Sequence, residues 1–295
     1  MAKVNIQELL DNGVHFGHLT RKWNPNMAPY IYTERNGVHI IDLYKTAAKI
    51  EETSEALNKI ANSGRKILFV ATKKQAKDIV AEKAKAINMP YITERWPGGM
   101  LTNFVTIRKA VKKMALIDRM KIDGSFDALS KREKLQINRQ REKLEKNLGS
   151  ISDMTRLPGA LFIVDIKKEH IAVAEAQKLN IPIFAMVDTN SDPRQVDYVI
   201  PANDDASKSI DKVLSFVTDA VAEGLSDRKA DKEKVKETKE VAAPETEEVA
   251  PKAEETKEDA PKKKEVKAKA PKAKAVKVKE PKVEEAKVEE AKVEE

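Results

Sequence analysis

Short runs that are almost entirely apolar recur through the first 225 residues of the chain. Such a run is typical of a strand buried on both faces, as the strands of a parallel sheet are. The longest runs are residues 66–71, 160–164 and 183–187, and the shorter candidates are 90–92 and 198–200. We therefore predict the strands of a parallel sheet at these positions.

Apolar residues at helical spacing lie between these runs. The four stripes are Leu43, Ala47, Ile50, Leu57 and Ile60; Ala76, Ile79, Val80, Ala84 and Ile87; Ile171, Ala174 and Leu179; and Ile210, Val213, Leu214, Val217 and Val221. We expect Gly224 to end the last helix. Strands that alternate with helices predict an α/β fold, in which helices cover both faces of a parallel sheet.

Residues 103–156 interrupt this alternation. The apolar positions at helical spacing in their first part are Phe104, Ile107, Val111, Met114 and Ile117. The second part is charged, and its thin apolar seam is Leu135, Leu144 and Leu148. Two helices joined near Gly124 would form a helical, coiled-coil hairpin. It would project from a discontinuous α/β domain of residues 1–102 and 157–225.

The last segment, residues 226–295, has a different composition. It contains no Phe, Tyr, Trp, Ile, Leu or Gly, and a Pro-Lys pair recurs every ten residues from Pro251 to Pro281. Such a segment cannot bury enough apolar area to offset about 1–2 kcal/mol per residue of backbone ordering. We predict a low-complexity, disordered tail.

Positive charge is concentrated in the predicted hairpin. The chain has 55 Lys and Arg against 48 Asp and Glu, a net charge of +7. Residues 226–295 contain 20 basic and 20 acidic side chains, whereas residues 103–156 contain 14 basic and 7 acidic ones. One segment therefore carries the whole excess, which indicates a nucleic-acid partner. Anionic membrane surfaces attract the same charge, so the sign alone leaves both partners open.

Several classes of protein are excluded by composition. The absence of Cys rules out a disulfide framework, a zinc ribbon and a cysteine nucleophile. No apolar run is long enough to span a membrane, and the first ten residues lack the pattern of a secretory signal. We expect a cytoplasmic protein.

The motif His15-Phe16-Gly17-His18 precedes Arg21, Lys22 and Trp23. The two histidines could form a metal pair, but no third ligand is spaced nearby, so we expect them to bond the backbone or RNA. Arg21, Lys22 and Trp23 supply two cations and an aromatic face, which suit phosphate contact and stacking. A buried tryptophan with two solvated cations is the alternative.

Two further segments are candidates for anion binding. Lys73 and Lys74 stand where a predicted strand ends and a helix begins, so the helix N-terminus would strengthen an anion site. No glycine-rich phosphate loop is present there, which disfavours a soluble nucleotide cofactor. Residues 94–103, with Trp96 and the glycine pair Gly98 and Gly99, predict a tight turn that exposes its backbone. Ordinary surface lysines and a simple hinge are the alternatives.

An enzyme remains possible on this fold. Asp165, Asp188 and Asp192 lie at or beyond strand ends, where Mg²⁺ ligands or acid–base groups stand in α/β enzymes, and Arg194 could hold an anion. Asp165 is also well placed to cap a helix, and residues 188–193 are ordinary turn chemistry. Because no hydrolase or metalloprotease motif is present, we predict no catalytic activity.

Taken in order, five motifs carry a resemblance to a known family. They are Gly13-Val-His-Phe-Gly-His18, Arg21-Lys-Trp-Asn-Pro25, Ala71-Thr-Lys-Lys-Gln-Ala76, Arg95-Trp-Pro-Gly-Gly99 with Leu101-Thr-Asn103, and Asp188-Thr-Asn-Ser-Asp-Pro193. In this order they resemble the bacterial small-subunit ribosomal protein S2 family. The resemblance runs from about Val4 to Gly224, and the tail is not part of it.

The resemblance implies a flavodoxin-like domain with an inserted coiled-coil hairpin, on a structural protein that binds 16S ribosomal RNA and helps to recruit ribosomal protein S1. It implies neighbouring small-subunit proteins as partners, and no cofactor, small-molecule substrate or membrane. The RNA contacts that we predict are Arg21, Lys22, Trp23, Lys73, Lys74, Arg95, Trp96, Gly98, Gly99, Asn103, Arg108, Lys109, Lys112 and Lys113. A sugar-phosphate or nucleotide enzyme and a scaffold that binds anionic membranes remain the alternatives.

Overall fold

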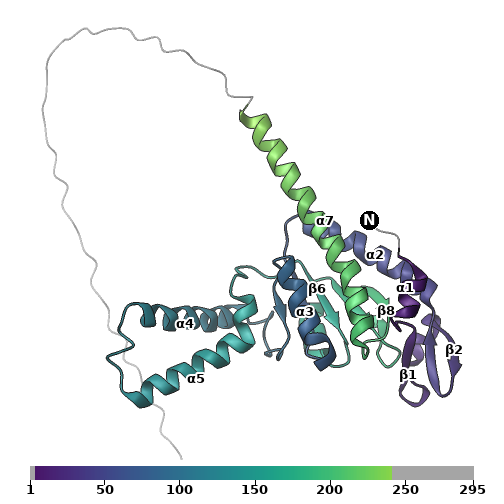
Figure 1. The fold of residues 1–295 in the computed structure, drawn as a ribbon, viewed down its shortest axis with the longest axis horizontal. Coiled ribbons are helices and arrows are strands. Elements are labelled where there is room, and N and C mark those ends of the chain that lie inside the picture. Colours follow the sequence, from purple (N-terminus) through teal and green to yellow (C-terminus); the bar gives the residue numbers. More distant parts are fainter. Residues whose placement is uncertain (1–3, 241–295) are drawn as a thin grey trace, which may run out of the picture. The chain divides into compact units, whose positions relative to one another are not determined.

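The computed structural model describes residues 4–240, so the part of the predicted tail beyond Glu240 lies outside the described residues (Figure 1). Its centre is a parallel sheet in the order β5-β4-β6-β7-β8. The strands are β4 (Ile67–Val70), β5 (Tyr91–Ile92), β6 (Ala160–Val164), β7 (Ile183–Val187) and β8 (Tyr198–Pro201). All five predicted strands are confirmed, and their order is that of a flavodoxin-like fold.

Helices cover both faces of this sheet because alternate side chains of each strand point in opposite directions. The helices are α2 (Leu43–Asn62), α3 (Lys74–Ala86), α6 (His170–Lys178) and α7 (Ser207–Glu240), after a short α1 (Ile6–Asp11). Ile67 and Phe69 of β4 pack in the cluster that includes α2, α3 and α7. Leu68 and Val70 pack in the other cluster, with α6 and the base of the hairpin.

A second, three-stranded antiparallel sheet precedes α2 and was not predicted. It contains β1 (Phe16–Leu19), β2 (Ile31–Arg35) and β3 (Val38–Ile41) in the order β1-β3-β2. The turn between β2 and β3 holds Asn36 and Gly37, both with positive φ (53° and 74°). An Asn-Gly pair between strands is the strongest short-range hairpin signal in a sequence. The hairpin of β2 and β3 was therefore predictable from the sequence.

The last helix does not end at Gly224. All five predicted stripe residues of α7 are buried, but the helix continues to Glu240, through the start of the predicted tail. Gly224 serves the packing of α7 on α2, which lie side by side (Figure 1). A Cβ atom at Gly224 would lie 2.6 Å from the carbonyl oxygen of Asn58. The glycine permits close approach of two helices, and the prediction of a helix stop was wrong.

The predicted stripe of α6 was also wrong. Ile171 is 45% exposed, whereas Val173 and Glu175 are buried. This helix is short and packs on the sheet through small residues, so its buried face includes Ala172 and Ala176 rather than the largest apolar side chains. The buried glutamate of this helix, Glu175, accepts hydrogen bonds from the loop between β5 and α4.

The insertion forms the predicted helical hairpin of α4 (Phe104–Ile122) and α5 (Lys131–Leu148), which projects from the α/β body (Figure 1). Ser130 and Glu133 form a capping box that starts α5. Asn103 occupies the N-cap position of α4, but its side chain accepts a bond from the Thr106 hydroxyl and not from the backbone. Leu135, expected in the seam, is 51% exposed.

Among residues 4–240, no helix combines the length and the apolar character that crossing a bilayer requires.

Candidate nucleic-acid interface

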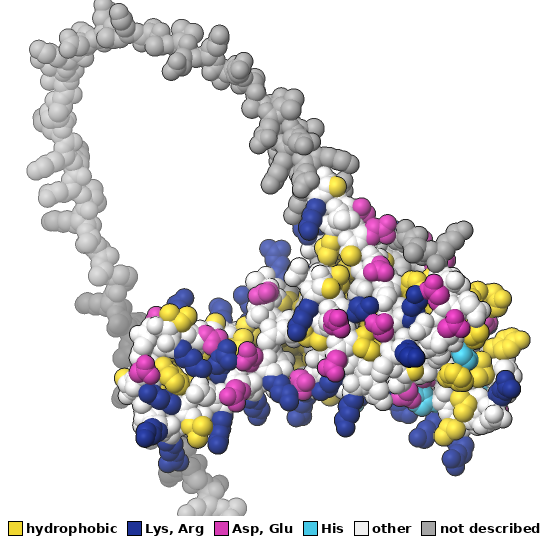
Figure 2. Space-filling model, in the orientation of Figure 1, with side chains coloured by type: hydrophobic (Ala, Val, Ile, Leu, Met, Phe, Trp, Pro, Cys, Tyr) yellow, Lys and Arg dark blue, Asp and Glu magenta, His cyan; other side chains and the backbone are white. Residues whose placement is uncertain are grey.

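The hairpin presents exposed cations that have no partner in the described part of the chain. Lys109, Lys112 and Lys113 of α4 are exposed, and none of them forms an ion pair there. Figure 2 shows Lys and Arg side chains spread over both helices, with acidic side chains among them. These three lysines lie within about one helical turn of one another, so they can act on a single stretch of polyanion.

Arg108 has a structural contact as well. Its guanidinium donates to the carbonyl oxygen of Thr155 at 3.0 Å, which ties α4 to the segment that follows α5. Arg141 of α5 lies against Asp118 of α4 and also donates to Glu145 at 2.6 Å. The hydrogen bond to Asp118 raises the pKa of Arg141, and the opposing effect of burial is smaller. The Arg141–Asp118 pair links the two helices, whereas the Arg141–Glu145 pair lies within α5. These contacts leave the three α4 lysines without an ion-pair partner among the described residues.

The hairpin surface is not only cationic. Four large apolar side chains lie on it with more than half of their surface exposed: Val105 (69%), Leu116 (57%), Ile122 (85%) and Leu135 (51%). Exposed apolar residues scattered singly are normal on a protein surface. They do not form the continuous apolar face that insertion into a membrane interface would need.

The loop between β5 and α4 is fixed by one buried carboxylate, Glu175 of α6. Its Oε1 accepts hydrogen bonds from the Trp96 indole at 3.1 Å and the Gly99 N–H at 2.8 Å. Its Oε2 accepts from the N–H groups of Leu101 at 2.9 Å and Thr102 at 3.1 Å, and from the Thr102 hydroxyl at 3.2 Å. Burial acts to raise the pKa of Glu175, but these hydrogen bonds lower it overall.

This anchoring changes the role of Trp96. Its side chain is only 6% exposed and its N–H is bonded to Glu175, so the stacking on RNA that an exposed Trp96 would offer is excluded. Gly98 is exposed, and Gly99 has φ +82°, so the tight turn that the sequence predicted is present. Sequence reasoning missed Glu175 because a glutamate in a helix is usually at the surface.

Lys73, one of the predicted RNA contacts, is bonded to carboxylates within the fold. Its ammonium lies 2.8 Å from Asp204, 2.6 Å from Asp205 and 4.0 Å from Asp165, and its side chain is 12% exposed. Burial acts to lower the pKa of Lys73, and the bonds to Asp204 and Asp205 raise it overall. This lysine neutralises an internal acidic cluster. Lys74, by contrast, is exposed at the start of α3 and has no partner among the described residues.

The acidic cluster at the carboxyl edge of the sheet also contains His18. Its Nδ1 lies 2.8 Å from Asp188 and its Nε2 lies 3.3 Å from Asp205. The bond to Asp188 raises the pKa of His18, against the effect of burial. Asp204 is fully buried, its Oδ2 has no hydrogen-bond partner, and burial together with Asp188 and Asp165 raises its pKa to about 7.

Four residues of this cluster could hold a metal ion. One ligand atom from each of His18, Asp188, Asp204 and Asp205 lies within 4.8 Å of the others. An imidazole nitrogen with carboxylate oxygens is a donor set that suits a divalent cation. His15 is not part of this group. Its ring lies against that of Phe16, with the centroids 4.0 Å apart and the planes tilted by 38°. The histidine pair considered from the sequence therefore does not form.

Tight packing holds β1 against the loop that follows β7. A Cβ atom at Gly17 would lie 2.6 Å from the Thr189 methyl group and 3.0 Å from the His39 carbonyl oxygen. The Thr189 hydroxyl accepts the His18 N–H at 2.8 Å. Asp192 accepts a hydrogen bond from the Arg194 N–H at 3.1 Å and another from the side-chain amide of Asn26 at 3.1 Å. These aspartate and glycine positions join the two sheets, and Asp192 acts as a turn cap.

The segment between β1 and β2 exposes a second group of candidate contacts. Arg21 and Lys22 are exposed, and Trp23 is 38% exposed with its ring 5.1 Å from that of His39. Other exposed aromatic and apolar side chains of this region are Phe16 (49%), Leu19 (42%) and Tyr32 (76%). Trp23 therefore retains a free face, as the stacking prediction requires.

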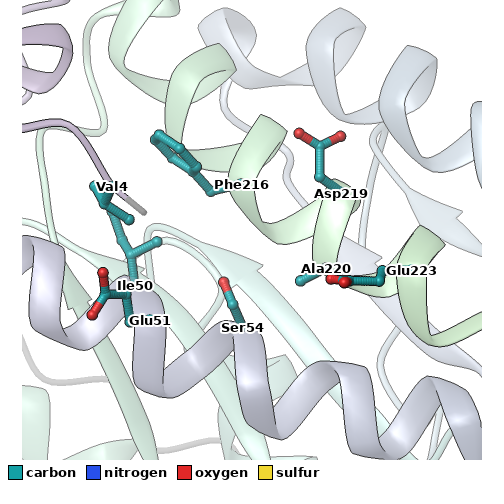
Figure 3. Close-up of a pocket in the computed structure, with 8 residues that line it drawn as sticks. All are labelled: Val4, Ile50, Glu51, Ser54, Phe216, Asp219, Ala220 and Glu223. Carbon is teal, nitrogen blue, oxygen red and sulfur yellow. The ribbon is translucent and has the colours of Figure 1, made fainter. Parts of the chain in front are cut away.

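The aspartates considered for catalysis, Asp165, Asp188 and Asp192, do not line the cavity between α2 and α7. A cavity of about 300 Å³ lies between α2 and α7, where Val4, Ile50 and Phe216 meet Ser54 and Asp219 (Figure 3). None of its lining residues comes from the carboxyl ends of the strands, where α/β enzymes place their active sites. Asp165 caps the turn after β6 through the N–H groups of Lys167 and Lys168.

Comparison with known proteins agrees with the motifs. A sequence model of the family described as Ribosomal protein S2 matches residues 9–224. The chain is 78% identical over 245 residues to the small ribosomal subunit protein uS2 of Flavobacterium johnsoniae, which covers 83% of this chain and 96% of that protein. It is 67% identical over 232 residues to the protein of the same name from Parabacteroides distasonis, covering 79% and 84%. The chain therefore belongs to the ribosomal protein S2 family, whose members are structural proteins of the small ribosomal subunit.

Proposed function

We propose that the chain binds 16S ribosomal RNA in the small subunit of the cytoplasmic ribosome, with the hairpin α4–α5 as its main contact. The observation that carries this proposal is a group of three exposed lysines on α4, Lys109, Lys112 and Lys113, which have no ion-pair partner among the described residues. Lysines that neutralise phosphates release condensed counterions, so the affinity falls steeply with salt. The other predicted contacts that support the proposal by their exposure are Arg21, Lys22, Trp23, Lys74, Arg95, Gly98 and Asn103.

We also propose that the chain contributes to the recruitment of ribosomal protein S1, as the family resemblance implies. The exposed apolar side chains of the N-terminal sheet, Phe16, Leu19 and Tyr32, support a protein contact in general. Apolar side chains gathered on one exposed surface are typical of protein interaction sites. The function is structural in this proposal, and no residue has a catalytic role.

Charge reversal tests the main contact. The variant Lys109→Glu, Lys112→Glu, Lys113→Glu should fold normally by circular dichroism but show reduced occupancy on small subunits in sucrose gradients. A matched control is Lys59→Glu, Lys178→Glu, Lys208→Glu, which reverses three exposed lysines of the α/β body. Normal occupancy of the hairpin variant, or an equal loss in both variants, would reject the hairpin as the principal RNA contact.

A further inference from the structure

The carboxyl ends of β4 and β6 frame a pocket that the proposed hairpin contact does not use. In the order β5-β4-β6-β7-β8, the chain moves outward from β4 to β5 and then returns to β6 on the other side of β4. The helices that follow these strands, α3 and α6, pack on opposite faces of the sheet. The loops after β4 and β6 therefore diverge, and ligands of open α/β sheets bind at such a switch point.

A pocket of about 540 Å³ lies at this point. Thr72, which follows β4, lines it together with Lys168 and Glu169, which follow β6. Arg95 and Pro97 of the anchored loop close another side. The volume is in the range of small-ligand pockets, and the loop that borders it is held rigidly by Glu175.

The charges that remain available in this pocket are positive. Arg95 is exposed and has no partner among residues 4–230, whose side chains the structure describes. Lys168 donates to the Thr72 carbonyl oxygen at 2.9 Å and pairs with no carboxylate in the described chain. Glu94 is compensated by Lys77 at 3.1 Å and Lys146 at 3.4 Å.

Glu169, the other carboxylate of the pocket, is occupied by Thr72. It accepts the Thr72 N–H at 3.1 Å and also the Thr72 hydroxyl. Thr72 is a neutral donor, and the charge of Glu169 is offset by the nearby Lys168. Arg95 has no carboxylate partner among the residues whose side chains are described, so it can still bind an anion. The pocket consequently favours an anionic ligand, and a planar guanidinium is well suited to phosphate.

The remaining wall suits a nucleobase. Ile171 is 45% exposed and lines the pocket with Pro97, which together offer an apolar surface to a flat ring. Asn147, at the end of α5, also lines the pocket, and its amide has no hydrogen-bond partner in the described part of the chain. An amide can donate and accept along the edge of a base.

We infer that this switch-point pocket takes up one unstacked nucleotide of the RNA that the chain binds. Arg95 and Lys168 hold its phosphate, Ile171 and Pro97 cover one face of its base, and Asn147 bonds the base edge. The inference rests on the proposed RNA-binding function and adds a site at which single-stranded RNA is distinguished from duplex. Proteins recognise unpaired RNA bases in this way, by contact with the ring face and bonds to the edge.

The test uses the full chain with its isoleucine methyl groups labelled for NMR, and three probes. These are a single-stranded RNA hexanucleotide, an RNA duplex and the four nucleoside monophosphates. The hexanucleotide should shift the Ile171 methyl signal. Arg95→Glu and Lys168→Glu should each weaken its binding about tenfold. Lys178→Glu, which reverses an exposed lysine at the far end of α6, should leave the binding unchanged.

Each other result overturns the inference. An unmoved Ile171 signal, or equal binding of both Arg95→Glu and the parent chain, would show that no nucleotide enters the pocket. Equal affinity for the duplex would show that unpaired bases are not selected, and equally tight binding of a monophosphate would indicate a free-nucleotide site. Failure of the proposed hairpin contact is distinguished by a separate measurement. The variant of Lys109, Lys112 and Lys113 is tested by its occupancy on small subunits, and it leaves Ile171 and the pocket unchanged.

Discussion

The hairpin and the carboxyl edge of the sheet both contain lysines, but they use them in opposite ways. Lys112 on α4 projects into solvent without a partner in the described chain, whereas Lys73 lies between three carboxylates. Asp204, which bonds Lys73, is 131 residues away along the chain. The role of a lysine thus depends on whether the fold places carboxylates next to it. An exposed lysine can bind another molecule only where no carboxylate of the fold already pairs with it.

The strongest test of this contrast is removal of the paired cation, Lys73. Lys73→Ala would leave Asp165, Asp204 and Asp205 without their shared positive charge, in surroundings that already raise the pKa of Asp204. We expect the free energy of unfolding to fall by about 3–5 kcal/mol, the usual cost of breaking a buried ion pair from one side. Urea denaturation of the parent chain and the variant measures it. A loss similar to that of Lys74→Ala, its exposed neighbour, would contradict the comparison.

The second test concerns Glu175, which holds the loop at the border of the switch-point pocket. Glu175→Gln keeps the shape but removes the charge and replaces one of the two accepting oxygens by an NH₂ group, which cannot accept the N–H groups that face it. We therefore expect a loss of at least about 2 kcal/mol. Hydrogen exchange should accelerate at the N–H groups of Gly99, Leu101 and Thr102. Unchanged exchange in this loop would show that Glu175 does not anchor it.

The same carboxylate predicts a pH dependence. Because the pKa of Glu175 is lower in the folded chain than its usual value of 4.5, its contribution to stability is complete above that pH. The contribution is lost as the pH falls through the lowered folded value. The parent chain should therefore lose its stability advantage over Glu175→Gln on acidification below about pH 4.5, and a constant difference between the two would refute the assignment.

Helix packing gives a smaller expected effect. Gly224→Ala places a methyl group 2.6 Å from the Asn58 carbonyl oxygen, and we expect destabilisation of about 1–3 kcal/mol. Gly149→Ala is the matched control, because its nearest neighbour, the Glu145 side chain, would lie 3.5 Å away in ordinary contact and its φ of −58° suits alanine. Thermal melting compares the two. Equal melting temperatures would mean that α7 can move away from α2 at little cost.

The comparison between regions also shows where sequence reasoning ends. Strands such as residues 160–164 can be predicted from the sequence, because a strand buried on both faces has no polar positions. The hairpin and its charge were likewise visible from periodicity and counting. Glu175, Asp204 and Lys73 could not be assigned, because their roles arise from partners that are distant in sequence. The Asn36-Gly37 turn was a local signal, and it was overlooked.

The smallest effect is expected from a single exposed lysine, and it sharpens the contrast with Lys73. Lys112→Ala should leave the free energy of unfolding within about 0.5 kcal/mol of the parent value, because the exposed ammonium forms no ion pair among the described residues. If Lys112 meets one phosphate, the slope of log K against log salt for RNA binding should decrease by about 1. Filter binding at several salt concentrations measures this slope. A variant that loses stability but keeps the full slope would place Lys112 in the same class as Lys73, and the division between the two regions would no longer hold.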